Sequence, residues 1–535
     1  MMLLLGYAFV ALTQPSAVFG ASDDSLNKPN IVVILADDLG YGDVHCYNPE
    51  RGKIPTPNMD RLAAQGMRFT DAHSSSGLCS PSRYTILTGR YHWRTRLGTG
   101  IVNIWERPLI APDRMTIGTL AKQQGYRTAA IGKWHLGWNW PITKEQRRWM
   151  NGKRDEVATD EHQRVWQEVF SQPILDGPTT RGFDYYFGTC VPNWPPYCFI
   201  ENDRTIGIPS ELLRPDQLTQ SVEGIWLGDA QGPALAGWNF ERILPALAER
   251  AERFITESAA KSKPFLLYMP LTTPHTPLTP NEEWQGKSGL NKSVADLIME
   301  TDAVVGRIMA AVEKTGQAKN TLFLMTSDNG FAPYVGAKDL ELQGHFPSGP
   351  LRSYKGDVYE GGHRIPFIIR WPEVVKPNSV CHQLVHHADL MATLADILNM
   401  NLSDNVGEDS FSLLPILKGE DKPIRENAIS CAYNGMPGIR VGSWKLIVGR
   451  ASLPNATGGT YMLVPEMKTQ LYNLADDLGE ENDLLDKYPD RAKRMFALYE
   501  KLVSDGRSNP GPPQKNDDDC TPYLQLPRVD LSLQR

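Results

Sequence analysis

Side chains that could bind a metal ion or move a proton follow four apolar runs of this chain. The run over 31–35 is β-branched, continuous and bounded by polar residues, as buried strands are, and the other three also look like strands. Parallel strands place their carboxyl ends along one edge of an α/β sheet, where ligands bind, so we expect these side chains to converge there. The residues concerned are Asp37, Asp38, Lys133, His135, His275, Asp328 and Asn329.

Four of these residues, Asp37, Asp38, Asp328 and Asn329, offer only oxygen ligands. Oxygen-rich sites suit hard cations rather than zinc. The adjacent carboxylates Asp37 and Asp38 would also repel each other without a counter-charge. We therefore predict one divalent cation, with Ca²⁺ as the first choice and Mg²⁺ as the alternative. Standing alone, the Asp37-Asp38 pair could equally be a turn with two solvated acids.

The segment from Leu78 to Arg90 places a potential nucleophile at the start of a helix. Pro81 suits the first turn of that helix, which puts Cys79 at its N-terminus, where unpaired amides and the helix dipole favour anions. Arg83 lies four residues later on the same face. A nucleophile beside a guanidinium is suited to a tetrahedral oxyanion. A buried structural cysteine is the alternative that composition allows.

The elements that must position these residues alternate between strands and helices. This alternation predicts an α/β fold with a large, mostly parallel sheet sandwiched by helices. Expected strands cover 31–35, 127–131, 265–271, 321–325 and 365–370, and expected helices cover 58–66, 294–312 and 390–398. Beyond 401–427, short strands over 428–433, 438–448 and 469–474 and a helix over 489–504 predict a small α+β domain with an antiparallel sheet.

The chain divides into four predicted parts. Residues 1–21 contain no Asp, Glu, Lys or Arg and end in small residues, whereas their apolar run is too short to span a membrane. We expect a signal peptide there, hence export to a periplasmic, extracellular or lysosomal-type compartment; an uncleaved anchor is the alternative. No later run suggests a membrane span. The other parts are a catalytic domain (29–420), a small C-terminal domain (425–508) and an extended tail (509–535).

Composition excludes some classes of protein. The 535 residues carry 55 Lys and Arg against 62 Asp and Glu, a net charge of −7. Such a balance gives no reason to expect nucleic acid as a partner, and an anionic substrate would need a local basic pocket. The seven cysteines leave at least one unpaired, and none has zinc-site spacing, although Cys190 and Cys198 could close a small loop.

The pattern Cys79-x-Pro81-x-Arg83, followed by Leu87-Thr88-Gly89-Arg90, resembles the signature of the type I, arylsulfatase-like sulfatases of the alkaline phosphatase superfamily. Further segments are similar to family segments and occur in the family's order, so the resemblance extends over about 30–506. These segments are 37–43, 132–137, 273–275, 327–330, 355–366, 442–446 and 471–474.

The resemblance implies a reaction. A formylglycine-generating enzyme would convert Cys79 to formylglycine, whose hydrated aldehyde attacks a sulfate monoester. Arg83, Lys133, His275 and Lys355 would bind the sulfate group. An O-sulfated carbohydrate is the expected substrate, as a small molecule or part of a glycan.

The resemblance also implies acid and base roles. His275 is the candidate acid for the leaving alcohol, with Lys355 as the alternative, and His135 is the candidate base for sulfate release. Lys133 and His135 are two residues apart, so in an extended chain both would face the site while Trp134 faces away.

The chain departs from the family pattern after 182–188, where members often carry a polar side chain. No serine aligns there, and Asn193 is a candidate replacement that we leave outside the predicted site. Several aromatic and histidine side chains could line a substrate pocket or simply pack. They are Trp138, Trp194, Tyr197, His345 and His363.

Two other functions remain open. A phosphate mono- or diesterase of the same superfamily would share the fold and the metal ligands. A non-catalytic protein that binds sulfated glycans would lack some site residue, and none of those matched above is missing.

Overall fold

The computed structural model describes residues 28–152, 157–213, 230–449, 468–518 and 520. The predicted signal peptide and most of the predicted tail lie outside these residues. Among the helices described, none is both long enough and apolar enough to cross a membrane.

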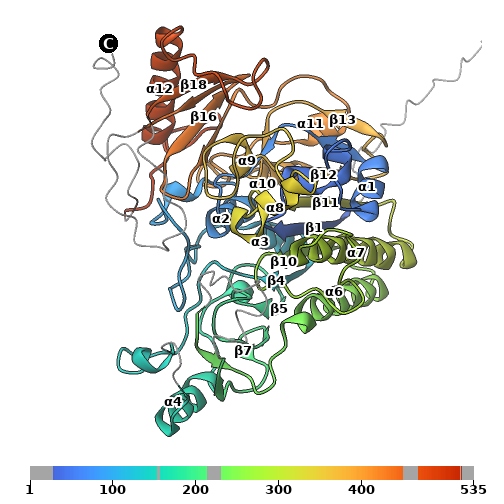
Figure 1. Ribbon diagram of the computed structural model, residues 1–535, viewed down its shortest axis with the longest axis vertical. Helices are drawn as coiled ribbons and strands as arrows, with labels where there is room; N and C mark the ends of the chain where they lie inside the picture. The colour runs from blue at the N-terminus through green and yellow to red at the C-terminus, as the bar shows by residue number, and fades with distance from the viewer. Residues whose placement is uncertain (1–27, 153–156, 214–229, 450–467, 519, 521–535) are drawn as a thin grey trace, which may run out of the picture.

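The centre of the molecule is a sheet with ten strands in the described part of the chain, in the order β13-β2-β12-β11-β1-β10-β4-β5-β6-β7 (Figure 1). Its middle is parallel, because β1 pairs with both β10 and β11, β10 pairs with β4, and β4 pairs with β5. The bounds of these strands are β1 Asn30–Asp37, β10 Phe265–Pro274, β11 Thr321–Ser327, β4 Arg127–Lys133 and β5 Tyr185–Thr189.

Strands of mixed direction flank this middle. Strand β12 is antiparallel to β11 and to β2, and β6 is antiparallel to β5 and β7. Among the pairs formed by these flanking strands, the one between β13 and β2 is parallel. The bounds are β2 Met67–Phe69, β6 Ile200–Glu201, β7 Arg204–Thr205, β12 Phe367–Arg370 and β13 Ser379–Cys381.

Helices cover both faces of the sheet, as predicted. Successive residues of β1 point to opposite faces: Ile31, Val33 and Leu35 join one apolar core, and Val32 and Ile34 join the other. The first core is covered by α2 Cys79–Thr88, α3 Ile117–Gln123 and α10 Asp389–Ile397. The second is covered by α1 Pro57–Ala64, α6 Ile243–Ala260 and α7 Ser293–Lys314 (Figure 1).

A second, smaller sheet, which includes the labelled strands β16 and β18, lies beside helix α12 (Figure 1). Its four strands in the described residues are antiparallel: β15 Asn427–Cys431, β16 Pro437–Val441, β17 Trp444–Ile447 and β18 Gln470–Asn473. Helix α12, Pro489–Ser504, packs on it through Met495, Tyr499 and Leu502. The predicted α+β character and antiparallel sheet are therefore confirmed.

The sequence prediction differs from the structure in a few elements. The expected strand over 438–448 is a hairpin of β16 and β17, which turns at Gly442 with φ 56°. Helix α6 was not predicted. The charged segment over 139–180, which has only weak helical signals in the sequence, includes the α-helix α4 Asp160–Phe170. Cys190 and Cys198 are free thiols rather than a closed loop.

Gly132 lets β4 approach β10 at the residue before Lys133. A Cβ atom at Gly132 would lie 1.8 Å from the carbonyl oxygen of Pro270, and φ is 142°. Gly132→Ala should therefore separate the strands and lower the free energy of unfolding by about 3 kcal/mol or more, measured in urea. Gly125→Ala is the control, because its φ is 82° but no atom lies within 4 Å. It should cost only about 1 to 2 kcal/mol, and equal losses in both variants would contradict the steric argument.

Candidate active site

The candidate site lies beyond the carboxyl ends of the parallel strands. Asp37 is the last residue of β1, and Lys133 is the last of β4. Asp328 follows β11 directly, and His275 follows β10 directly. The N-terminus of α2 adds Cys79. Strand ends that are far apart in sequence thus bring these groups together, as Asp37, Asp38, Cys79 and His275 each place a ligand atom within 4.8 Å of the others.

Buried cations pair with the site carboxylates. Lys133 Nζ lies 2.7 Å from Asp37 Oδ2, and Lys355 Nζ lies 2.7 Å from Asp38 Oδ2. Arg83 donates to Asp328 Oδ2 from both Nε and Nη2, at 3.1 and 2.8 Å. Its Nη2 also lies 3.2 Å from Asp37 Oδ1. Arg83 is on the same face of α2 as Cys79, as the helical spacing predicted.

The pKa values of two carboxylates in this cluster are shifted in opposite directions. Burial raises the pKa of Asp328 to about 7, with the nearby Asp37 charge adding to the effect. Burial alone would also raise the pKa of Asp37, but Lys133, His275 and Arg83 together hold it well below its usual range. An additional cation would keep both groups ionised.

The residues predicted to bind a metal fit a hard divalent cation. Asn329 Nδ2 donates to Asp38 Oδ1 at 2.8 Å, whereas Asn329 Oδ1 is buried and has no hydrogen-bond partner among the described residues. A buried oxygen without a hydrogen-bond partner, on a residue that contacts Asp38 and follows Asp328, is the kind of ligand that Ca²⁺ or Mg²⁺ needs. The backbone of the Asp37-Asp38 turn is also fixed, because Asp38 N–H donates to Asp328 Oδ1 at 3.1 Å.

Cys79 is 2 % exposed and lies among charged groups. Its Sγ is 3.5 Å from Asp37 Oδ1 and 3.8 Å from Lys355 Nζ. Burial raises the pKa of the Cys79 thiol well above its usual value. The unmodified thiol is therefore protonated and a poor nucleophile at neutral pH.

His135 has the features of a base. Its Nε2 lies 3.1 Å from the carbonyl oxygen of Val102 and must donate to it, which leaves Nδ1 unprotonated. Nδ1 is buried without a partner in the described chain. Burial, followed by the charges of Lys133 and Arg83, keeps the pKa of His135 well below its usual value, so the ring is neutral.

The route by which His135 enters the site differs from the prediction. Strand β4 ends at Lys133, and His135 has a left-handed φ of 52° instead of an extended one. Trp134 does face away, since it packs against Trp138 and Phe183 in the core.

His275 lies between the Asp37-Asp38 turn and its own strand. Its Nδ1 donates to the carbonyl oxygen of Thr276 at 2.7 Å, and its Nε2 is 3.8 Å from Asp38 Oδ2. Burial lowers the pKa of His275 to about 4. An anionic substrate would have to raise that pKa before the ring could act as an acid. Burial would lower the pKa of Lys355, but Asp38, Cys79, Tyr334 and Asp37 together outweigh it and hold the pKa well above its usual value, so Lys355 stays charged.

Some neighbours of the site were missed. Tyr334 OH lies 3.4 Å from Lys355 Nζ, and its only signal in the sequence is its place five residues after Asn329. Asn193, the proposed replacement for a family polar residue, is buried with Nδ2 3.5 Å from Thr276 Oγ1, next to His275.

Two of the residues predicted to line a pocket, Trp138 and Trp194, line a small pocket beside His135, with Trp105 and Trp140 as further walls. His345 pairs with Asp43 at 2.8 Å. His363 belongs to a separate buried cluster. Tyr197 OH donates to the carbonyl oxygen of Asn193.

Comparison with known proteins identifies the family. A family model described as Sulfatase matches residues 29–400. The chain is 32% identical over 513 residues to an N-acetylgalactosamine-6-O-sulfatase of Bacteroides thetaiotaomicron, with 89% of this chain and 93% of that protein covered. It is 31% identical over 469 residues to arylsulfatase A of Homo sapiens, with 85% and 83% covered.

Solved structures agree with these relatives. A Bacteroides thetaiotaomicron structure, described under the metabolism of multiple glycosaminoglycans, has a TM-score of 0.74 and 30% identity, and covers 89% of this chain and 99% of that chain. The phosphonate monoester hydrolase of Agrobacterium radiobacter shares the fold alone, with a TM-score of 0.55, 19% identity, and 89% and 95% coverage.

The sheet, its helical layers and the charged site at the strand ends define a hydrolase of the alkaline phosphatase type. Within that class, the chain belongs to the sulfatase family and is a sulfuric ester hydrolase.

Removing divalent cations should inactivate the enzyme and lower its melting temperature, because the buried carboxylates lose their counter-charge. Addition of Ca²⁺ or Mg²⁺ should restore both, with about 2.7 kcal/mol of stabilisation at a cation concentration of 100 Kd. Asn329→Ala should lose most of this stabilisation. Asp302→Asn is the control, since Asp302 is buried but caps α1 instead. Full activity after exhaustive chelation would disprove the metal requirement.

Proposed function

We propose that this sulfatase is an exported, formylglycine-dependent enzyme that removes sulfate from O-sulfated carbohydrates. The observation that carries the proposal is the convergence of Arg83, Lys133 and Lys355 around Cys79 and a set of buried oxygen ligands. A sulfate group is a compact anion, and these cations can neutralise the charge on its oxygens in a site that excludes water.

The proposed maturation follows from the chemistry of residue 79. As a thiol, Cys79 is protonated and a poor nucleophile. As hydrated formylglycine, residue 79 would carry two hydroxyl groups on one carbon, at the positive end of α2. A divalent cation held by Asp37, Asp38, Asp328 and Asn329 would supply Lewis-acid chemistry beside them.

Two histidines would divide the proton transfers. One hydroxyl of residue 79 gives up its proton to solvent and its oxygen attacks sulfur, the bond from sulfur to the alcohol oxygen breaks, and His275 gives that alcohol its proton, with Lys355 as the alternative donor. His135 Nδ1 then takes the proton of the second hydroxyl. The carbonyl re-forms, the bond between carbon and the sulfate oxygen breaks, and sulfate leaves. Water restores the hydrate.

A substrate class follows from the relatives. The match to an N-acetylgalactosamine-6-O-sulfatase supports sulfated amino sugars as the first compounds to assay. Export is part of the proposal and rests on the uncharged, apolar start of the sequence. A phosphate esterase is the competing function, favoured only by the fold shared with a phosphonate hydrolase.

Active enzyme should contain formylglycine at position 79. Cys79→Ala should abolish turnover but keep the melting temperature within a few degrees, because the thiol contacts are long. Peptide mass spectrometry and hydrolysis of a chromogenic sulfate ester against its phosphate analogue provide the measurements. Cys198→Ala, at another buried cysteine, should stay active. An active enzyme with only free thiol at position 79, or preference for phosphate, would refute the proposal.

The two histidine variants should fail at different steps. His135→Ala should release one equivalent of alcohol in a burst and then stop, because the covalent sulfate ester on residue 79 cannot collapse. His275→Ala should show no burst, and its defect should shrink for alcohols that leave easily. Rapid-mixing kinetics with a series of aryl sulfates tests both.

The opposite pattern, with a burst from His275→Ala alone, would mean that the roles are exchanged. Equal losses without a burst or leaving-group dependence would reduce both residues to binding roles.

A further inference from the structure

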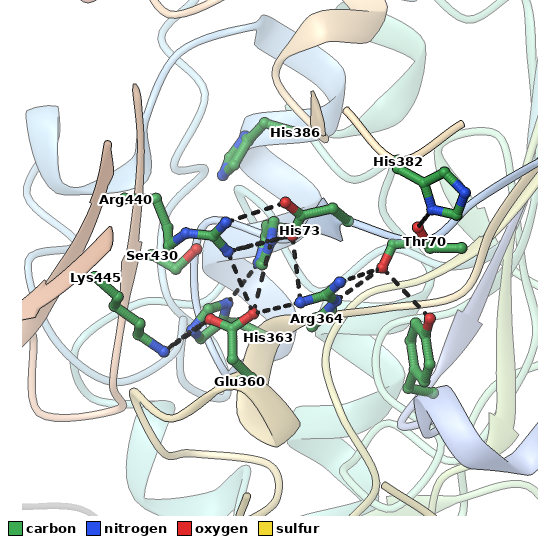
Figure 2. A network of polar contacts seen from close by, with 12 residues as sticks. Thr70, His73, Glu360, His363, Arg364, His382, His386, Ser430, Arg440 and Lys445 are labelled. Carbon is green, nitrogen blue, oxygen red and sulfur yellow. Dashed lines mark hydrogen bonds and ion pairs between the residues drawn. The ribbon is translucent and has the colours of Figure 1, made fainter. Parts of the chain in front are cut away.

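A second buried cluster of charged residues lies where the small C-terminal sheet meets the catalytic domain (Figure 2). Its centre is Glu360, the first residue of the short helix α9, Glu360–His363. Arg440 of β16 and Lys445 of β17 reach Glu360 from the small sheet, as Figure 2 shows. Because Glu360 and Lys445 are fully buried, water cannot replace these contacts.

The contacts of Glu360 are close and numerous. Lys445 Nζ lies 2.9 Å from Glu360 Oε1, and Arg364 Nη1 lies 3.1 Å from Oε2. Arg440 Nη1 is 3.5 Å from Oε2. The backbone N–H of Glu360 donates to Glu480 Oε2 at 2.7 Å, and Lys445 Nζ also lies 2.8 Å from Glu480 Oε1. The start of α9 is thus held through both its side chain and its backbone by residues that follow the catalytic domain.

The cluster contains possible metal ligands, but its charges are already balanced. His73, Glu360 and His363 could together hold an ion, and the two Nδ1 atoms are 3.1 Å apart. However, three carboxylates of the cluster already form ion pairs with three cationic side chains. The carboxylates are Asp71, Glu360 and Glu480, and the cations are Arg364, Arg440 and Lys445. A dication would leave this buried site with excess positive charge, which is costly.

The cluster is connected to the active site through a short piece of backbone. Lys355 lies five residues before Glu360. The next residue, Gly356, donates its N–H to the carbonyl oxygen of Gly77 at 2.8 Å and accepts one from Tyr433 of the small domain at 2.9 Å. The loop with Lys355 is therefore fastened at Gly356 and again at Glu360.

The same elements also hold the segment that leads to the nucleophile. Gly77 N–H donates to the carbonyl oxygen of Cys431, at the end of β15, and Cys431 N–H donates to that of Ser75, both at 2.9 Å. At the other end of α9, Ser74 N–H donates to the carbonyl oxygen of His363 at 2.9 Å. The segments before Cys79 and around Lys355 are therefore held by one set of backbone hydrogen bonds, and some of these come from the small domain.

We propose that Lys445 and Arg440 are positioning residues of the sulfatase reaction, which hold Lys355 in its sulfate-binding place through Glu360. This inference rests on the proposed role of Lys355 in binding sulfate. Loss of the Lys445 charge releases the start of α9, so Lys355 Nζ moves relative to Asp38 and to residue 79. The small domain would thus contribute to sulfate binding by holding Lys355 in position.

The inhibition constant of inorganic sulfate separates positioning from mere stabilisation, because it does not depend on how much enzyme is folded. We expect Lys445→Met to raise this constant at least tenfold and to raise KM in the same direction. Lys355→Ala should do likewise, and the double variant should be no weaker in sulfate binding than Lys355→Ala alone. All values are measured on metal-loaded enzyme, well below its melting temperature.

Arg94→Met is the matched control. Arg94 is also fully buried and links the catalytic domain to the small domain, through Asp409 at 2.8 Å and the carbonyl oxygen of Leu502 in α12, but it does not touch the Glu360 cluster. It should lower the melting temperature, whereas the sulfate inhibition constant should change less than twofold. If Lys445→Met does not fold, Glu360→Gln and Arg440→Lys replace it, each with an expected rise of at least threefold.

The outcomes are distinguishable. An unchanged inhibition constant in Lys445→Met, or in both replacement variants, overturns the positioning role if Lys355→Ala still shows its defect. No defect in Lys355→Ala would remove the sulfate-binding role of Lys355 itself. Metal analysis should find one dication per chain, and a second one that is lost in His363→Ala would show that the cluster is a metal site instead.

Discussion

The structure depends on a group of charges that water cannot reach. Asp37, Asp38 and Asp328 lie at the ends of β1 and β11, and each is paired with a buried cation. Inside a protein such charges interact far more strongly than on its surface, so leaving one without a partner is costly. The parallel sheet provides partners for these charges, because it brings strand ends from distant parts of the chain to one edge and fixes their side chains there.

Much of this could be predicted because two patterns are local. Apolar runs such as those of β1 and β11 indicate buried strands, and a polar residue after each run marks the ligand edge. What failed was long-range geometry. His135 reaches the site through a left-handed residue rather than an extended strand, and Tyr334 approaches Lys355 from a loop without any periodic signal. His345, which pairs with Asp43, and His363, which lies beside Glu360 in the interdomain cluster, make contacts that no local pattern indicates.

The two domains are less separate than their sheets suggest. Cys431, which ends a strand of the small sheet, exchanges backbone hydrogen bonds with Ser75 and Gly77 of the catalytic domain. Lys445 and Arg440 add buried ion pairs at the same border. Sequence composition predicts a boundary near 401–427, and buried ion pairs join the parts on its two sides, so removing either part would leave unpaired charges in the other.

The burial of residue 79 bears on when its side chain could be modified. Only 2 % of Cys79 is exposed in the folded chain, and its helix α2 packs into one apolar core through Tyr84, Ile86 and Leu87. The conversion of Cys79 proposed above would therefore be easiest before α2 docks on the sheet. A molecule that folded before the conversion would keep its thiol until it unfolded again.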